Sequence, residues 1–123
     1  MQVERTIDSA TRVVLIRVSG PIADGELANL SNVVSSAPGV TPEFSLLIDL
    51  RDALGGAVTG PGVRVLARQP LVLSPTSRRA VVVPSVLGVG MARMYELLRE
   101  QGGGGARVFT DYDEAKRWVE LKA

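Results

Sequence analysis

Three short runs of this sequence carry apolar residues on both alternating sides, and they constrain the fold more than any other feature. They are residues 12–19, 45–50 and 79–83. A run of this length with apolar side chains on both alternating sides is typical of an interior β-strand that is covered on both faces. The first run ends at Gly20-Pro21 and the third at Pro84-Ser85, which are strand-ending pairs. These runs predict the core residues Leu15, Ile16, Leu47, Ile48, Val81 and Val82.

The segments around these runs alternate between strand and helix patterns. Residues 1–8 and 106–109 favour shorter strands, and Asp8-Ser9-Ala10 favours a turn after the first of them. Helices are expected after Pro21, around 63–69, from about 85 to 101, and after Asp111, where Glu114 completes a capping-box pattern. The resulting order is β-β-α-β-α-β-α-β-α. It predicts an α/β fold with a mixed sheet of about five strands and helices packed on it.

Length and charge fit one globular domain. The chain has 123 residues, the usual size of a single domain, so one domain is expected over residues 1–123. The net charge is +1 and only 4% of the residues are aromatic, so the clustered basic face and stacking rings of a nucleic-acid-binding protein are not expected. No apolar run approaches a membrane span, and the N-terminus lacks a signal-peptide pattern. A cytoplasmic location is therefore expected.

The sequence contains no cysteine and no histidine. Their absence excludes disulfides, zinc sites built from these residues, and nucleophilic machinery that needs a thiol or an imidazole. An enzyme would have to use carboxylates, lysine, tyrosine or a metal, and no convergent set of such residues stands out. The chain is therefore predicted not to be an enzyme and to need no cofactor.

Four segments together resemble a known family. They are Leu47-Ile48-Asp49-Leu50-Arg51, then Arg78 to Val83, then Gly90-Met91-Ala92-Arg93-Met94-Tyr95-Glu96, and lastly Val108-Phe109-Thr110-Asp111 with Glu114, Ala115 and Trp118. In this order of elements they resemble the STAS domain of sulphate transporters and anti-sigma-factor antagonists, and more narrowly its SpoIIAA-like branch. The likeness covers nearly the whole chain. It implies a regulatory domain that binds a protein partner.

In anti-sigma-factor antagonists, an Asp-Ser-Ser-Gly motif follows the strand that ends in Asp-Leu, and its second serine is phosphorylated. The matching position here is Thr59, followed by Gly60, whereas Ala57 and Val58 replace the acidic residue and the first serine of the motif. The resemblance therefore implies at most a remnant of the phosphorylation site. Thr59 is predicted instead to cap the second helix, because its hydroxyl can accept a hydrogen bond from a free backbone N–H.

Polar residues near the end of a central strand form one candidate site. Asp49, Arg51 and Asp52 lie there, and open α/β sheets usually bind ligands at the carboxyl ends of their strands. Asp111 is expected near the same edge. Paired carboxylates can hold Mg²⁺, but a structural role is favoured, in which they cap helices or pair with arginine. Surface charge is the favoured interpretation of Arg64, Arg68, Arg78 and Arg79.

A second candidate site lies where the third helix begins. Gly88-Val89-Gly90-Met91-Ala92-Arg93 resembles a dinucleotide-binding turn, but Arg93 stands where the third glycine is required. Met91 and Met94 can line a groove for an apolar ligand, although at helical spacing a core stripe is favoured.

Two functions remain open. The leading hypothesis is a non-enzymatic protein-interaction module that binds a partner and self-associates as a homodimer. The alternative is a carrier or sensor of a small apolar or nucleotide ligand beside the third helix. The candidate binding residues are Asp49, Arg51, Thr59, Gly60, Ser85, Gly90, Met91, Arg93 and Met94.

Overall fold

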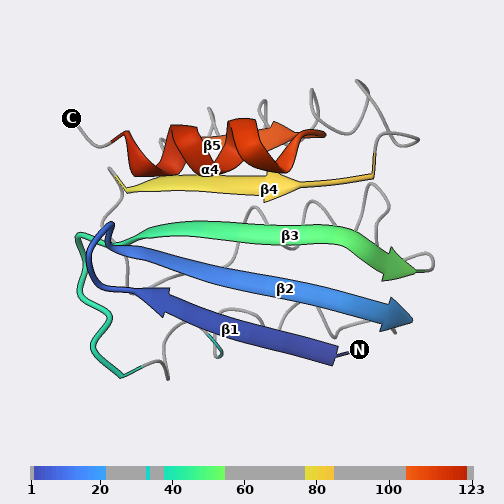
Figure 1. The fold of residues 1–123 in the computed structure, drawn as a ribbon, viewed down its shortest axis with the longest axis horizontal. Helices are drawn as coiled ribbons and strands as arrows, with labels where there is room; N and C mark the ends of the chain where they lie inside the picture. The colour runs from blue at the N-terminus through green and yellow to red at the C-terminus, as the bar shows by residue number, and fades with distance from the viewer. Residues whose placement is uncertain (1, 22–32, 34–37, 55–76, 85–104, 122–123) are drawn as a thin grey trace.

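The computed structural model describes residues 2–21, 33, 38–54, 77–84 and 105–121. They form a five-stranded sheet and one helix (Figure 1). The strands are β1 (Gln2–Asp8), β2 (Val13–Pro21), β3 (Ser45–Leu54), β4 (Arg78–Val82) and β5 (Gly105–Phe109), and the helix is α4 (Tyr112–Glu120). The expected α/β class and its five strands are confirmed. Apart from Val33, the three helices expected between the strands lie outside the described residues.

The sheet follows the order of the chain, β1-β2-β3-β4-β5. β1 runs antiparallel to β2, and β2 to β5 run parallel to one another. The predicted opening hairpin and mixed sheet are therefore confirmed. At the hairpin turn the Asp8 carboxylate accepts hydrogen bonds from the backbone N–H groups of Ala10 and Thr11, and Arg12 takes a left-handed conformation with φ 55°. The Arg12 carbonyl accepts a hydrogen bond from the backbone N–H of Ser45, which connects the turn to the start of β3.

Two strands are longer than the sequence predicted. β2 includes Gly20 and Pro21, which were expected to end it, and β3 runs to Leu54 instead of Leu50. The reason is that these ends pair with each other, since Gly20 is in register with Ala53 and Pro21 with Leu54. Asp49 therefore lies in the middle of β3 and not at its carboxyl end.

Both faces of the central strands are buried, as the apolar runs predicted. On one face, side chains of β2, β3 and β4 pack against Ala115 and Val119 of α4. In Figure 1, α4 lies in front of the sheet along β4 and β5; we call this side the α4 face. The opposite face presents residues that are no more than 5% exposed, namely Val14, Ile16, Val18, Leu46, Ile48, Leu50 and Val81.

Five of the six predicted core residues are buried. The exception is Leu15, which is only partly buried at the border of the core cluster. It lies on the α4 face of β2, whereas α4 packs on β3, β4 and β5. The prediction was wrong here because an apolar run does not show how far the covering helix extends.

Three arginine–aromatic contacts hold α4 on the sheet, from Arg51, Arg78 and Arg107. Near the helix start, the Arg51 guanidinium lies 4.7 Å from the centre of the Tyr112 ring. Near its end, Arg78 lies 5.0 Å from the centre of the Trp118 ring and donates a 2.7 Å hydrogen bond to the Trp118 carbonyl. That carbonyl belongs to the last helical turn, where carbonyls lack partners within the helix. The interpretation of Arg78 as plain surface charge was therefore wrong.

Asp111 caps α4, as the sequence predicted. Its carboxylate accepts hydrogen bonds from the backbone N–H groups of Asp113 (2.8 Å) and Glu114 (3.2 Å). We expect Asp111→Ala to lower the free energy of unfolding by about 0.5–2 kcal/mol, because both N–H groups lose their acceptor. Urea denaturation followed by circular dichroism measures this. Asp111→Asn is the matched control, since asparagine caps equally well; equal losses in both variants would contradict the capping role.

Among the described residues, no helix is long and apolar enough to cross a membrane.

Candidate functional site

The candidate site on the α4 face is built around Asp49. Asp49 is 1% exposed and is the one charged side chain among the described residues that is buried. Arg51 donates two hydrogen bonds to the Asp49 carboxylate, from Nε to Oδ1 at 3.0 Å and from Nη2 to Oδ2 at 2.9 Å. Two parallel bonds of this kind fix both the position and the orientation of the guanidinium.

Arg17 contacts the same carboxylate from the neighbouring strand. Its Nε lies 3.5 Å from Asp49 Oδ2. The pairing follows from the sheet, because β2 and β3 are parallel and Arg17 is in register with Asp49. One buried carboxylate therefore holds two guanidinium groups, whose side chains remain 43% (Arg17) and 41% (Arg51) exposed.

An irregularity in β3 contributes a third hydrogen bond to Asp49. Between Arg17 and Ser19 β2 advances two residues, while β3 advances three, from Asp49 to Asp52. Such an extra residue is left unpaired in the ladder. Here the backbone N–H of Arg51 donates to Asp49 Oδ1 at 3.1 Å. The Asp49 side chain thus supplies an acceptor where the strand pairing is interrupted.

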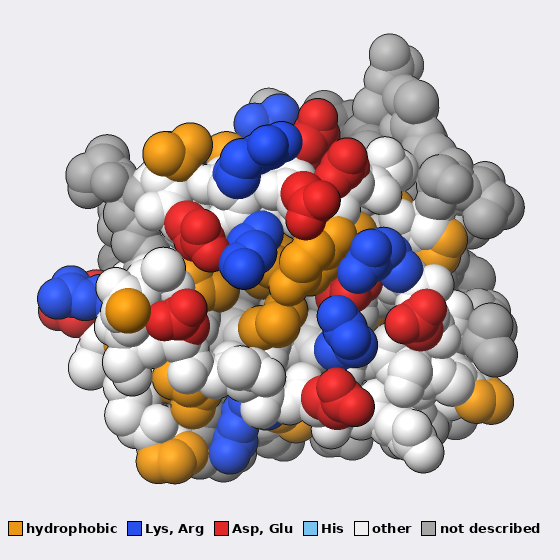
Figure 2. Space-filling view, viewed as in Figure 1, with side chains coloured by type: hydrophobic (Ala, Val, Ile, Leu, Met, Phe, Trp, Pro, Cys, Tyr) orange, Lys and Arg blue, Asp and Glu red, His pale blue; other side chains and the backbone are white. Residues whose placement is uncertain are grey.

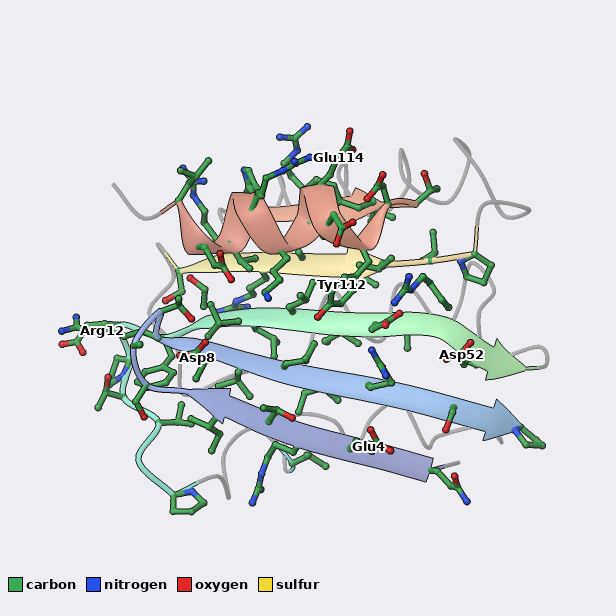
Figure 3. The ribbon with its side chains drawn as sticks, in the orientation of Figure 1. Glu4, Asp8, Arg12, Asp52, Tyr112 and Glu114 are labelled. Carbon is green, nitrogen blue, oxygen red and sulfur yellow. The ribbon has the colours of Figure 1, made fainter. Side chains whose placement is uncertain are left out.

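Tyr112 completes the cluster from α4. The residue follows the Asp111 cap directly, and its ring lies against the Arg51 guanidinium. A cation over an aromatic face is attracted by the ring electrons. Figure 3 labels Tyr112 at the start of α4, with Glu4 on β1 and Asp52 on β3 at the margins of the same face. We call Arg17, Asp49, Arg51 and Tyr112 the arginine cluster.

The arginine cluster keeps Asp49 ionised. Burial by itself raises the pKa of Asp49, but the side-chain and backbone hydrogen bonds from Arg51 and the charges of Arg51 and Arg17 outweigh it, so the pKa lies below its ordinary value. The hydrogen bonds to Asp49 raise the pKa of Arg51 in turn. A carboxylate in this state is an anchor for the two arginines, and it is poorly suited to accept a proton near neutral pH.

This pKa difference predicts how stability depends on pH. A carboxyl group whose pKa is lowered by folding stabilises the protein above its unfolded pKa, near 4, and this contribution is lost as the pH falls through the folded value. We therefore expect the wild type to be more stable than Asp49→Asn at pH 7, with a gap that narrows below about pH 4. Urea denaturation of both proteins at several pH values measures the gap. A gap that stays constant down to pH 3 would contradict the pairing.

The structure brings together two of the predicted site residues, Asp49 and Arg51. Asp52 is exposed on the same strand, and Asp111 is exposed and occupied as a helix cap. In the described ranges, no group of three or more acidic side chains lies close enough together to hold a metal ion. The favoured structural role of Asp49, pairing with arginine, agrees with its contacts. The other candidates lie outside the described residues: Thr59, Gly60, Ser85, Gly90, Met91, Arg93 and Met94.

Sequence reasoning missed Arg17 and Tyr112. A signal for Arg17 was present, because Arg17 interrupts one apolar run and Asp49 interrupts the next at the matching position. Opposite charges at equal positions of neighbouring parallel strands are natural partners. Tyr112 carried no such signal, since its contact depends on how α4 packs on the sheet.

Comparison with known protein families finds no match for this chain, and comparison with curated proteins finds no significant one.

Proposed function

We propose that this chain is a non-enzymatic regulatory module of the cytoplasm that binds a protein partner through the arginine cluster and self-associates. The observation that carries the proposal is the pair of half-exposed guanidiniums anchored on one buried carboxylate. Arginine and tyrosine are enriched among the residues that dominate binding energy at protein interfaces. The proposal also rests, by analogy only, on the resemblance to the STAS domain and its SpoIIAA-like branch.

The anchoring favours binding because it lowers the entropic cost. A free arginine side chain loses much of its rotamer freedom when a partner immobilises it. Here Arg51 is already held by Asp49 on one side and by the Tyr112 ring on another. A partner that contacts Arg51 therefore meets a side chain whose position is set before binding.

The surface around the cluster has the mixed character of an interface. Figure 2 shows apolar side chains reaching the surface near the centre of the α4 face, with basic and acidic side chains around them. Leu15 and Tyr112 are among the partly buried apolar residues that border the core here. Apolar area ringed by charged groups is the usual arrangement of a protein-binding patch.

Affinity capture from the source cells tests this proposal. The bait proteins are the wild type, Arg17→Gln, and Arg117→Gln as a matched control, since Arg117 is an exposed arginine of α4 that contributes only its backbone carbonyl to the helix end. Arg17→Gln leaves the bidentate Arg51–Asp49 pair in place, and circular dichroism checks that each bait is folded. We expect the wild type and Arg117→Gln to retain the same protein and Arg17→Gln to retain less of it.

Native mass spectrometry of the purified chain supplies the opposing outcome. A homodimer agrees with the proposal. A small molecule retained by the chain, together with no protein retained by any bait, would overturn the proposal in favour of a ligand carrier. Equal capture by all three baits would show that the arginine cluster is not the binding surface.

A further inference from the structure

The two guanidiniums of the arginine cluster have donors left over after Asp49 is satisfied. Arg51 uses Nε and Nη2 on Asp49, and a guanidinium carries five N–H groups in all. Arg17 makes only the 3.5 Å ion pair to Asp49; its Nε is buried without a hydrogen-bond acceptor, so the donors it offers to solvent are those of its Nη groups. Among the described residues, then, the cluster keeps unused donors on side chains that are over two-fifths exposed.

The charges of the cluster do not balance. Arg17 and Arg51 carry two positive charges, and the buried Asp49 carries one negative charge. Glu4 is the register partner of Arg17 on β1, yet no ion pair within 4 Å joins them in the described part of the chain. Within ion-pair distance, two guanidiniums therefore share one carboxylate, while the exposed Asp52 also acts on Arg51 through its charge. The excess positive charge that can attract an anion from solvent thus lies mainly at Arg17.

The spacing of the two guanidiniums suits a carboxylate. Both already contact the same oxygen, Asp49 Oδ2, at 3.5 Å from Arg17 and 2.9 Å from Arg51. Two groups that converge on one buried carboxylate are close enough for a second carboxylate to contact both from the solvent side. The planar guanidinium of arginine presents pairs of N–H donors that match the two oxygens of a carboxylate, and it forms strong, charge-assisted hydrogen bonds with them.

Apolar side chains flank the exposed guanidiniums. Leu15 lies two residues before Arg17 on the same face of β2, and Tyr112 lies against Arg51. Both are only partly buried. A ligand that places an acidic side chain on the guanidiniums therefore also places its neighbouring residues against apolar surface. A peptide with acidic and apolar residues side by side meets both requirements.

We infer that the arginine cluster is the docking site for an acidic segment of a protein partner, with a carboxylate of that segment bridging Arg17 and Arg51. The inference rests on the proposed function and specifies the chemistry of the partner. Asp49 acts as a positioning residue, because it holds the two arginines at the required spacing without contacting the segment. Tyr112 and Leu15 contact the apolar residues next to the bridging carboxylate.

A peptide titration followed by NMR tests the inference on the intact chain. The probe is an acetylated and amidated hexapeptide of alternating glutamate and leucine, and its control is the same peptide with glutamine in place of glutamate. We expect the acidic peptide to shift the guanidinium N–H signals of Arg17 and Arg51, those of the Nη groups above all, at millimolar concentration or below, and the glutamine peptide to leave them unchanged. Added salt should weaken the binding, because exposed charges are screened.

Two variants connect the shifts to the proposed contact. Arg17→Gln should weaken binding of the acidic peptide about tenfold, equivalent to about 1.4 kcal/mol, and Arg17→Lys should fall between it and the wild type, because lysine keeps the charge but loses the fork. Arg117→Gln should bind like the wild type. Thermal melting of each variant shows that the fold is retained.

Three results would overturn the inference. One is the absence of shifts at Arg17 and Arg51 with 10 mM acidic peptide, a concentration well above the roughly millimolar affinity of a single weak contact. The second is binding that Arg17→Gln leaves unchanged. The third is an equal response to inorganic phosphate alone, which would indicate a site for small oxyanions. The affinity capture described above separates this inference from the proposed function. If the wild type captures a protein that Arg17→Gln does not, the proposed function stands even when the acidic peptide fails to bind. If no bait captures a protein, the proposed function is wrong whatever the peptide does.

Discussion

Replacement of Asp49 with alanine is expected to destabilise the protein by about 2–4 kcal/mol. Removal of one partner from a fully buried ion pair typically costs 3–5 kcal/mol, because the remaining charge stays buried without compensation. Here the two arginine side chains are 41–43% exposed, so they can turn toward water, and the expected loss extends below that range. The variant also leaves the Arg51 backbone N–H without its acceptor. Urea denaturation at pH 7 measures the loss.

Two further substitutions separate the origins of this loss. Asp52→Ala removes an exposed aspartate from the same strand and should change stability by less than about 0.5 kcal/mol. Asp49→Asn keeps an oxygen that can accept from the Arg51 backbone but removes the charge, and it should fall between Asp52→Ala and Asp49→Ala. Equal stability of Asp49→Ala and Asp52→Ala would show that the Arg51–Asp49–Arg17 contacts contribute nothing to the fold.

The strands of this chain were predictable because their signals are local. An apolar run such as residues 45–50 can be satisfied only by burial on both faces, and its length fits a strand. The Asp111 cap was equally local, since its carboxylate bonds to N–H groups two and three residues further along the chain. The apolar pattern that forces burial spans only a few consecutive residues, and the cap and its N–H partners are also only a few residues apart.

The candidate site was only half predictable because its other half depends on distant pairing. Asp49 and Arg51 are neighbours on β3, and their pairing could be anticipated from sequence. Arg17 reaches Asp49 only because β2 and β3 pair in one particular register, and a shift by one residue would turn Arg17 to the opposite face. Tyr112 reaches Arg51 only because α4 packs on the α4 face. Register and helix packing are set by the whole core.

Arg78 shows the same limit at the other end of α4. Its position in sequence indicates a charged residue at the start of a strand, which is usually solvated. In the structure its guanidinium makes two contacts with Trp118: it lies over the ring, and it donates a hydrogen bond to the backbone carbonyl. Both come from a helix that begins more than thirty residues later. Local pattern therefore assigned the residue to the surface, whereas tertiary packing makes it part of the helix anchor.

Trp118 is the centre of that anchor, and it joins α4 to two strands. Its ring lies 5.7 Å from the Phe109 ring of β5, and Arg78 and Arg107 lie 5.0 and 5.7 Å from its centre. The residue is partly buried, as its place on the inward stripe of α4 predicted. Truncation of this side chain removes an aromatic pair and two cation–π contacts in one step, so its effect should far exceed that of truncating an exposed residue of α4.

Trp118→Ala is expected to lower the free energy of unfolding by about 2–4 kcal/mol. Truncation of a fully buried tryptophan typically costs about 3–5 kcal/mol, and the loss expected here is somewhat smaller because part of the ring already faces water. Trp118→Phe keeps an aromatic face for Arg78 and Phe109 and should lose less than half as much. Arg117→Ala, an exposed neighbour, should stay within about 0.5 kcal/mol. Trp118 is the single tryptophan, so circular dichroism must follow the unfolding of all three variants. If Trp118→Ala proves no worse than Arg117→Ala, the contacts of Trp118 with Arg78, Arg107 and Phe109 do not anchor α4.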